Sequence, residues 1–138
     1  MNDEFTLDPR LANDSIYITD LALCQIRLNN DSRYPWFILI PKLNNISEII
    51  DLSPQQQQQL WQESAALSFW LKKHYKHAKL NVAALGNVVA QLHIHHIVRF
   101  VHDDAWPAPV WGKFPAIGYT EEAKTTLKHQ FLQTFLFP

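Results

Sequence analysis

The sequence lacks several features that would assign it to common classes of protein. It has a single cysteine, Cys24, which rules out an internal disulfide framework and predicts a reducing, cytoplasmic location. Its 12 basic side chains are balanced by 13 acidic ones, so no broad cationic surface is expected to bind nucleic acid. No apolar run approaches the roughly 18 residues of a membrane span. The acidic start at residues 1–4 does not resemble the cationic head of a signal peptide. We therefore expect neither a nucleic acid nor a membrane as partner.

The chain does contain enough apolar material for one folded core. It has 138 residues, of which 47% are hydrophobic and 12% aromatic. A chain of this length buries roughly two-thirds of the surface that its unfolded form exposes, so it needs no disulfide or metal to fold. We find no internal repeat and no linker. We therefore expect one domain over residues 1–138, with a core over 16–101 and a Pro/Trp-rich loop and C-terminal helix over 102–138.

Capping and turn signals divide the chain into five strands and two main helices. Ser53 followed by Pro54 is typical of a helix start, and apolar residues then recur at three- and four-residue steps as far as residue 75. Thr120 caps a second helix with acidic residues in its first turn. A helical turn is expected within 7–15, and strands at 16–18, 22–28, 34–40, 80–85 and 88–101. Since strands and helices do not alternate regularly, we expect an α+β domain with an antiparallel sheet and its helices on one face.

The chemistry is concentrated in the last of these strands, where four of the seven histidines lie between residues 93 and 102. Side chains alternate between the two faces of a strand. One face of the expected strand is mostly polar and carries Gln91, His93, His95, Ile97 and Arg99. His96 falls on the opposite, apolar face, so we interpret it as a packed histidine that bonds to the backbone or to a neighbouring subunit.

Two chemistries use a pair of imidazoles at this spacing. A metal ion could bind both rings, but no carboxylate follows and Arg99 on the same face would repel a cation. We therefore assign no metal site and no cofactor. The alternative is phosphoryl or nucleotidyl transfer, because a neutral imidazole is nucleophilic near pH 7 and can attack phosphorus while its other N–H is held by an acceptor.

Residues 86–97, GNVVAQLHIHHI, resemble the signature of the histidine triad (HIT) family, in which three histidines alternate with apolar residues after a glycine turn. Residues 37–42, FILIPK, ahead of a helix, resemble a second passage of that family. The resemblance covers roughly residues 16–101. It implies a HIT-like α+β fold, with an antiparallel sheet of about five strands, a main helix and a C-terminal helix.

The resemblance also implies catalytic roles. If the end of the family signature is aligned with residues 95–97, Gln91 stands first in the triad, His93 second and His95 third. In the other possible register, His93 is first, His95 second and Ile97 third. The position of the glycine turn favours the former. The family's middle histidine is the nucleophile, so the resemblance makes His93 the nucleophile. It makes His95 a phosphate contact that helps to protonate the leaving group. Gln91 departs from the family and cannot carry a proton.

Further residues are implied to bind the nucleotide. Asn29 lies where many members hold the ribose with an acidic residue. Trp36 lies near the position where many carry an additional histidine. The remaining nucleotide-binding candidates are Asn81, Asn87 and Arg99.

The resemblance implies a homodimer and a purine nucleotide or related phosphate compound as ligand. The loop that contains Trp106 and Trp111 either approaches the partner's site or is a surface loop anchored by these two side chains. Our leading hypothesis is a nucleotide hydrolase or nucleotidyl transferase that forms a covalent nucleotidyl-histidine. The alternative is a catalytically weak nucleotide-binding protein on the same fold.

Overall fold

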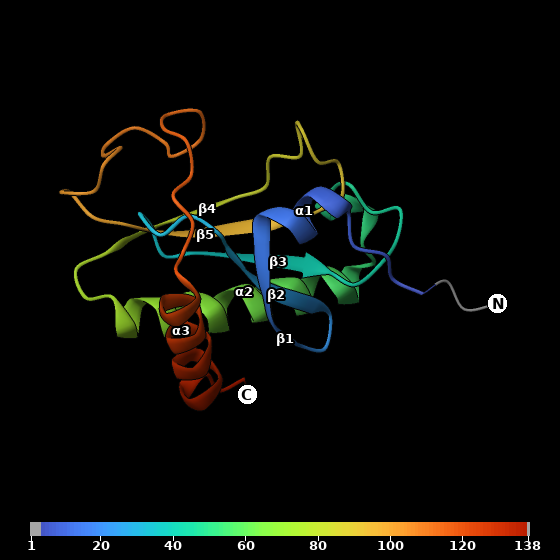
Figure 1. Ribbon diagram of the computed structural model, residues 1–138. Helices are drawn as coiled ribbons and strands as arrows, with labels where there is room; N and C mark the ends of the chain where they lie inside the picture. Colours follow the sequence, from blue (N-terminus) through green and yellow to red (C-terminus); the bar gives the residue numbers. More distant parts are fainter. Residues whose placement is uncertain (1–3, 138) are drawn as a thin grey trace.

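A computed structural model gives the structure of the chain and describes residues 4–137 (Figure 1). The acidic start at residues 1–3 lies outside the described residues. None of the described helices is both long and apolar enough to cross a membrane.

The centre of the molecule is a five-stranded antiparallel sheet, as the sequence predicts. Its strands lie in the order β1-β2-β3-β5-β4, and every neighbouring pair is antiparallel. β4 and β1 therefore form the two edges, and β2, β3 and β5 lie inside. The bounds are Ser15–Asp20 for β1, Cys24–Asn29 for β2, Trp36–Pro41 for β3, Lys79–Ala83 for β4 and Ile94–Arg99 for β5.

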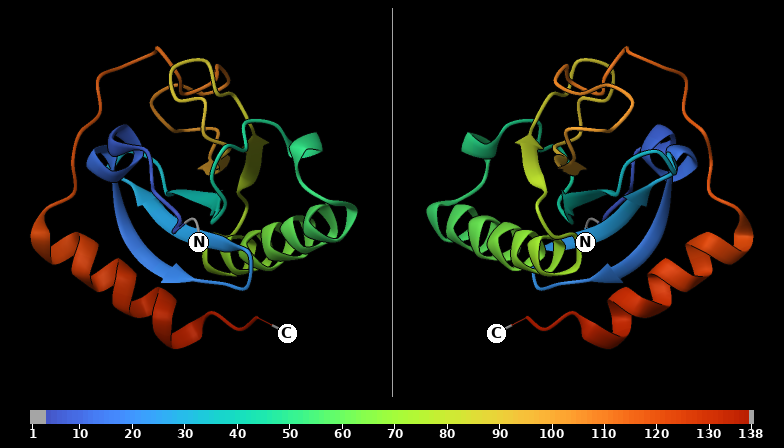
Figure 2. Two further views of the ribbon diagram at one scale, coloured as in Figure 1. Left: turned by 90° about the vertical axis from the view of Figure 1, so that its right-hand side faces the viewer. Right: turned by 90° about the vertical axis from the view of Figure 1, so that its left-hand side faces the viewer.

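The two long helices pack against one face of the sheet, as Figures 1 and 2 show. α2 spans Pro54–His74 and α3 spans Glu121–Thr134. The expected cap of α2 is confirmed, because the Ser53 hydroxyl accepts the Gln56 N–H while the Gln56 side chain accepts the Ser53 N–H. Buried residues of both helices, including Leu67 and Phe131, join those of the sheet in the larger apolar core.

The opposite face of the sheet is covered by α1 and by long connections. α1 spans Pro9–Asp14 and is capped by Asp8, which confirms the helical turn expected there. A second apolar cluster joins Trp36 and Ile97 of the sheet to Leu11 of α1 and Val110 of the segment after β5. Figure 2 shows the segments before and after β5 on this side, away from α2 and α3. A short 3-10 helix, η1, spans Ile49–Asp51.

The strand that carries the histidines is shorter than expected. We predicted a strand over 88–101, but residues 84–93 form an irregular segment and β5 begins only at Ile94. Gly86 turns the chain with a φ of 76°, and Val88 is 76% exposed. The pairing of β4 with β5 ends at Ala83 and His95, so the β-branched residues before β5 have no strand of the sheet beside them. Gln91 and His93 therefore do not follow the alternation of β5.

Candidate active site

The two imidazoles that the sequence indicates lie against each other at the start of β5. The ring centroids of His93 and His95 are 4.8 Å apart, with 74° between the ring planes. Both residues are 7% exposed, and both line a hollow of about 390 Å³ on the face of the sheet that carries α1. Leu85 and Val88 line the same hollow and are 46% and 76% exposed. The hollow is therefore open to solvent at these residues.

His93 is oriented by the backbone beside it. Its Nδ1 lies 2.7 Å from the carbonyl oxygen of Gln91. A carbonyl oxygen only accepts hydrogen bonds, so Nδ1 carries the proton and donates it. In the neutral ring, Nε2 then holds the lone pair. This is the arrangement that nucleophilic attack requires.

His95 has a different partner on the same ring atom. The indole Nε1–H of Trp36 in β3 donates to Nδ1 of His95 at 2.9 Å. Burial, together with the neighbouring His93 and His96, lowers the pKa of His95 to about 3. At neutral pH this ring is uncharged.

His96 faces the larger core, as the sequence predicts. Its Nδ1 donates to the Ile94 carbonyl at 3.1 Å, and its Nε2 accepts from the Ser64 hydroxyl of α2 at 2.7 Å. Burial lowers its pKa to about 4. Both ring nitrogens are paired inside the protein, so the interpretation of His96 as a packed histidine is confirmed.

The side chain of Gln91 bonds the N-terminal segment of the chain. Its side-chain oxygen accepts the Asp8 N–H at 2.8 Å, and its side-chain nitrogen donates to the Thr6 carbonyl at 2.9 Å. The amide thus fastens the N-terminal segment, and only the backbone carbonyl of Gln91 serves His93. The catalytic role expected for the Gln91 side chain stays a prediction. Its contact with the N-terminal segment was not foreseen because we expected a regular strand through residues 91–95, whereas β5 begins at Ile94.

Of the four residues predicted to bind nucleotide, two line the hollow and two do not. Asn29 and Asn87 lie in its wall with the histidines. The side chain of Asn81 instead accepts from Arg99 Nη1 at 3.0 Å. The guanidinium of Arg99 is 1% exposed and also donates to both carboxylate oxygens of Asp103 and to the Ala108 carbonyl. Asn81 and Arg99 therefore hold the loop after β5, and neither side chain lines the histidine hollow.

The loop after β5 completes the site from the same chain. Trp111 packs edge-on against His95, with centroids 5.2 Å apart, and against Trp36, with centroids 5.9 Å apart. It lines the histidine hollow and also a second hollow of about 380 Å³ beside it, to which Asp14 and Asn29 also contribute. In the described structure, Trp111 thus reaches the site of its own subunit.

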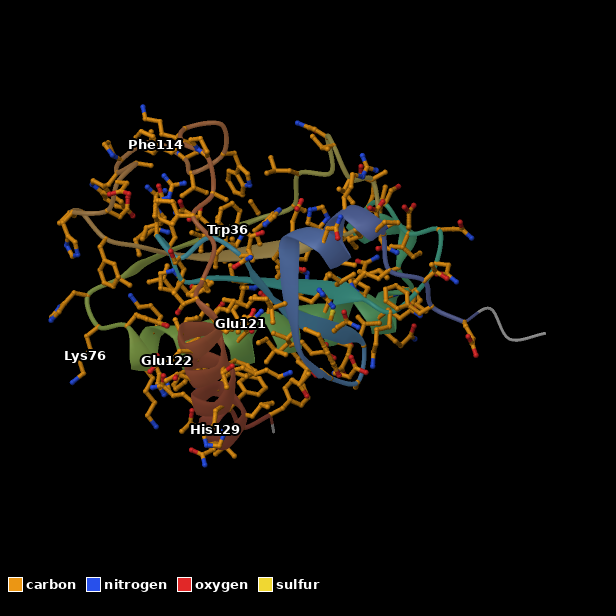
Figure 3. The ribbon with its side chains drawn as sticks, in the orientation of Figure 1. Trp36, Lys76, Phe114, Glu121, Glu122 and His129 are labelled. Atoms are coloured by element: carbon orange, nitrogen blue, oxygen red, sulfur yellow. The ribbon has the colours of Figure 1, made fainter. Side chains whose placement is uncertain are left out.

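Sequence reasoning missed Arg10 and Asp14 of α1 as wall residues, and it noted Trp36 only as a departure from the family. Figure 3 labels Trp36 on the side of the sheet that faces the loop of Phe114. The register of β3 on β5 explains why Trp36 lies at the site, because it pairs Ile38 with His95 and Trp36 with Ile97. Side chains two residues apart share a face, so Trp36 lies diagonally beside His95.

Among residues 4–137, no three His, Cys, Asp or Glu side chains are grouped so that they could hold a metal ion.

Comparisons with known proteins agree with the fold and with the histidine segment. A family model described as HIT domain matches residues 10–102. The chain therefore belongs to the HIT family, whose members are generally nucleotide-binding hydrolases or transferases. Among curated proteins, no significant match was found.

Solved structures of HIT proteins superimpose on nearly the whole chain. A histidine triad protein from Marinobacter aquaeolei VT8 is 46% identical, with a TM-score of 0.93 over 96% of this chain and 97% of that one. A histidine triad (HIT) protein from Sinorhizobium meliloti 1021 is 44% identical, with a TM-score of 0.91 over 96% and 97% of the two chains. A third, from Bradyrhizobium japonicum, is 39% identical, with a TM-score of 0.93 over 97% and 100%.

Proposed function

We propose that this protein is a nucleotide hydrolase or nucleotidyl transferase that uses Nε2 of His93 as its nucleophile. The observation that carries the proposal is the hydrogen bond from His93 Nδ1 to the Gln91 carbonyl, in a ring that lines an open hollow. This bond leaves the lone pair on Nε2. It also favours the register in which Gln91, His93 and His95 occupy the three triad positions.

In the first step, Nε2 of His93 attacks the phosphorus of a nucleoside phosphate linkage. A bond between Nε2 and phosphorus forms, and the bond from phosphorus to the leaving group breaks, with its electron pair going to the leaving group. The ring gains positive charge as the bond forms. The Gln91 carbonyl, which accepts the Nδ1–H, stabilises that charge.

In the second step, water or another acceptor attacks the same phosphorus from the open side. The bond to Nε2 breaks, the lone pair returns to the ring, and a proton from the attacking group passes to solvent. The protein is then unchanged and needs no cofactor. Whether the acceptor is water or a second hydroxyl decides between hydrolysis and transfer.

The substrate we propose is a purine nucleotide or a related phosphate compound. Asn29 and Asn87 line the hollow beside the histidines, and their amides can bond ribose or phosphate oxygens. Their place in the wall supports the binding role but does not select the base. A cytoplasmic location remains a prediction from the single cysteine.

We also propose that the protein forms a homodimer through its helices. Phe69 of α2 and Leu136 are 78% and 85% exposed, and both line an apolar hollow of about 780 Å³ along α2. A contiguous exposed apolar surface on a folded domain is typical of a contact with another chain. The size of the particle in solution, measured by light scattering, tests this part.

Trapping the intermediate tests the catalytic proposal. The protein is mixed with a dinucleoside polyphosphate or with an adenosine phosphoramidate, stopped at neutral to alkaline pH and analysed by mass spectrometry. We expect the mass of one nucleotidyl group, located at His93 by peptide mapping. We also expect His93→Ala to lose the adduct and to lose turnover by about 10³-fold or more.

His129→Ala is a matched control. His129 is an exposed histidine on α3, which packs on the other side of the sheet (Figure 3). We expect this variant to keep both the adduct and the turnover. Full turnover by His93→Ala would reject His93 as the nucleophile.

A second candidate function is nucleotide binding with little chemistry. It is favoured by the contacts of Gln91, whose amide binds the N-terminal segment, and by the uncharged state of His95. Calorimetry that shows micromolar nucleotide binding, without turnover or adduct over several hours, would select it.

A further inference from the structure

Two neighbouring imidazoles in the hollow are held in opposite tautomers. Nδ1 of His93 donates to a carbonyl, so its Nε2 holds a lone pair. Nδ1 of His95 instead accepts from the Trp36 indole at 2.9 Å. An indole N–H is a donor only, so the proton of neutral His95 lies on Nε2. His96 has the same tautomer as His93, because its Nδ1 donates to the Ile94 carbonyl.

The pairing of Trp36 with His95 lies in a buried, closely packed part of the sheet. Both side chains are buried, at 8% and 7% exposure, on adjacent central strands. The two rings meet edge to face with centroids 5.6 Å apart, and Trp111 packs against both of them. This packing on both rings favours the alignment of the indole N–H with Nδ1 of His95.

We propose that Trp36 is a positioning residue that keeps His95 an uncharged hydrogen-bond donor through Nε2–H. A site with such a donor suits leaving groups that depart as anions without taking up a proton. This inference rests on the proposed attack by His93. It assigns His95 the task of bonding a phosphoryl oxygen as charge develops on it. It replaces the expectation that His95 protonates the leaving group.

The substrate class follows from whether the leaving group needs a proton when its bond to phosphorus breaks. In a phosphoanhydride, the bond from phosphorus to the bridging oxygen breaks and a phosphate leaves with its electron pair as a stable anion. In a phosphoramidate, the leaving nitrogen must gain a proton before its bond to phosphorus breaks. A general acid contributes about 10²- to 10⁴-fold to such a step, and an uncharged His95 with its Nδ1 blocked does not supply one. We therefore infer that the substrates are nucleotides with a phosphoanhydride linkage.

The tautomers can be measured without any assay of activity. Two-bond ¹⁵N–¹H correlation spectra distinguish a ring nitrogen with a proton from one with a lone pair. In the wild type we expect a lone pair on Nδ1 of His95 and a proton on Nδ1 of His93 and His96, with the latter two as internal references. A proton on Nδ1 of His95 would overturn the proposal.

Two tryptophan variants separate the hydrogen bond from packing. Trp36→Phe keeps a ring beside His95 but removes the donor. We expect loss of the single tautomer and a higher pKa for His95, because the donor stabilises the neutral form. Trp111→Phe removes a tryptophan that packs on the same ring without bonding it, and it should leave the tautomer unchanged. Equal spectra for the wild type and Trp36→Phe would contradict the assignment; if Trp36→Phe does not fold, the wild-type spectrum decides.

A comparison of substrates tests the consequence for the reaction. We expect kcat/KM for a dinucleoside polyphosphate to exceed that for an adenosine phosphoramidate by about 10²-fold or more. In Trp36→Phe the ratio of these two kcat/KM values should fall by about tenfold, and by more at acid pH. The titratable and charged groups around His95 are His93, His96 and, from α1, Arg10 and Asp14, and the wild-type pH profile controls for all of them.

The outcomes separate the two proposals. A faster phosphoramidate reaction in the wild type would overturn the inference about His95, even if the adduct forms on His93. Full activity of His93→Ala would instead reject the proposed function, while the tautomer of His95 would still be tested by the spectra.

Discussion

The polar side chains at the two ends of β5 differ in how completely the protein satisfies their hydrogen bonds. At the Arg99 end, the guanidinium is matched by Asp103, Asn81 and the Ala108 carbonyl, and almost none of it is exposed. At the other end, His93 and His95 are each held through Nδ1, and among residues 4–137 no side chain or backbone group bonds their Nε2 atoms. We therefore call the Arg99 end structural, because its polar groups are all hydrogen-bonded within the protein. We call the end at His93 and His95 the candidate catalytic end, because each ring keeps an unbonded nitrogen beside the hollow.

The largest change is expected from breaking the structural end. Arg99→Met leaves the Asp103 carboxylate buried without its cation, which costs about 3–5 kcal/mol of the free energy of unfolding. Urea denaturation measures this loss. The loop that carries Trp111 loses an anchor, but the backbone of His93 does not, so adduct formation per folded molecule should survive. A variant as stable as the wild type would show that the buried ion pair does not hold this end.

Acid should weaken the other end of the strand first. The pKa values of folded His95 and His96 are about 3 and about 4, against an ordinary value of 6.5, because burial disfavours the charged ring. The unfolded chain therefore binds more protons. The stabilisation is complete above pH 6.5 and is lost as the pH falls towards the folded values. At pH 5 the loss is about 2 kcal/mol for each histidine.

The comparison between the ends gives the control for this prediction. Burial raises the pKa of Asp103, but hydrogen bonds from Arg99 and from two backbone N–H groups outweigh it, so the pKa lies below 3.8. The Arg99 end therefore loses stability only below about pH 4. Urea denaturation at pH 8 and pH 5 should show the loss, and His95→Gln should reduce it by about half. Equal stability of the wild type at both pH values would contradict the neutral state of these rings.

The sequence predicts the fold better than it predicts the site. Ser53 and Thr120 start their helices because capping is local chemistry. His96 is predictable because β5 does alternate from Ile94 onward. The same alternation fails at Gln91, because the segment before β5 has high strand propensity but no neighbouring strand. A strand needs a partner, and propensity alone does not supply one.

Contacts between distant segments explain the remaining differences. The pairing of Trp36 with His95 depends on the register of two strands that are 59 residues apart at this bond. The role of Arg99 depends on a turn that brings Asp103 back to the strand. Neither follows from spacing within one segment. The signature could therefore indicate His93, but it could not distinguish residues of the wall from residues that hold the loop.

The smallest and most selective test uses two asparagines that the sequence treats alike. Asn87 lines the histidine hollow, whereas Asn81 accepts from the buried Arg99 guanidinium. Asn87→Ala should raise KM for the nucleotide several-fold, at little cost in stability, because it removes an amide from the wall. Asn81→Ala should leave KM unchanged and lower the free energy of unfolding by about 1–3 kcal/mol, because a buried charged donor loses its acceptor. Steady-state kinetics and urea denaturation on both variants measure the contrast. If both variants changed KM alike, the division between a structural and a catalytic end of β5 would fail, because Asn81 would then reach the substrate despite its bond to Arg99.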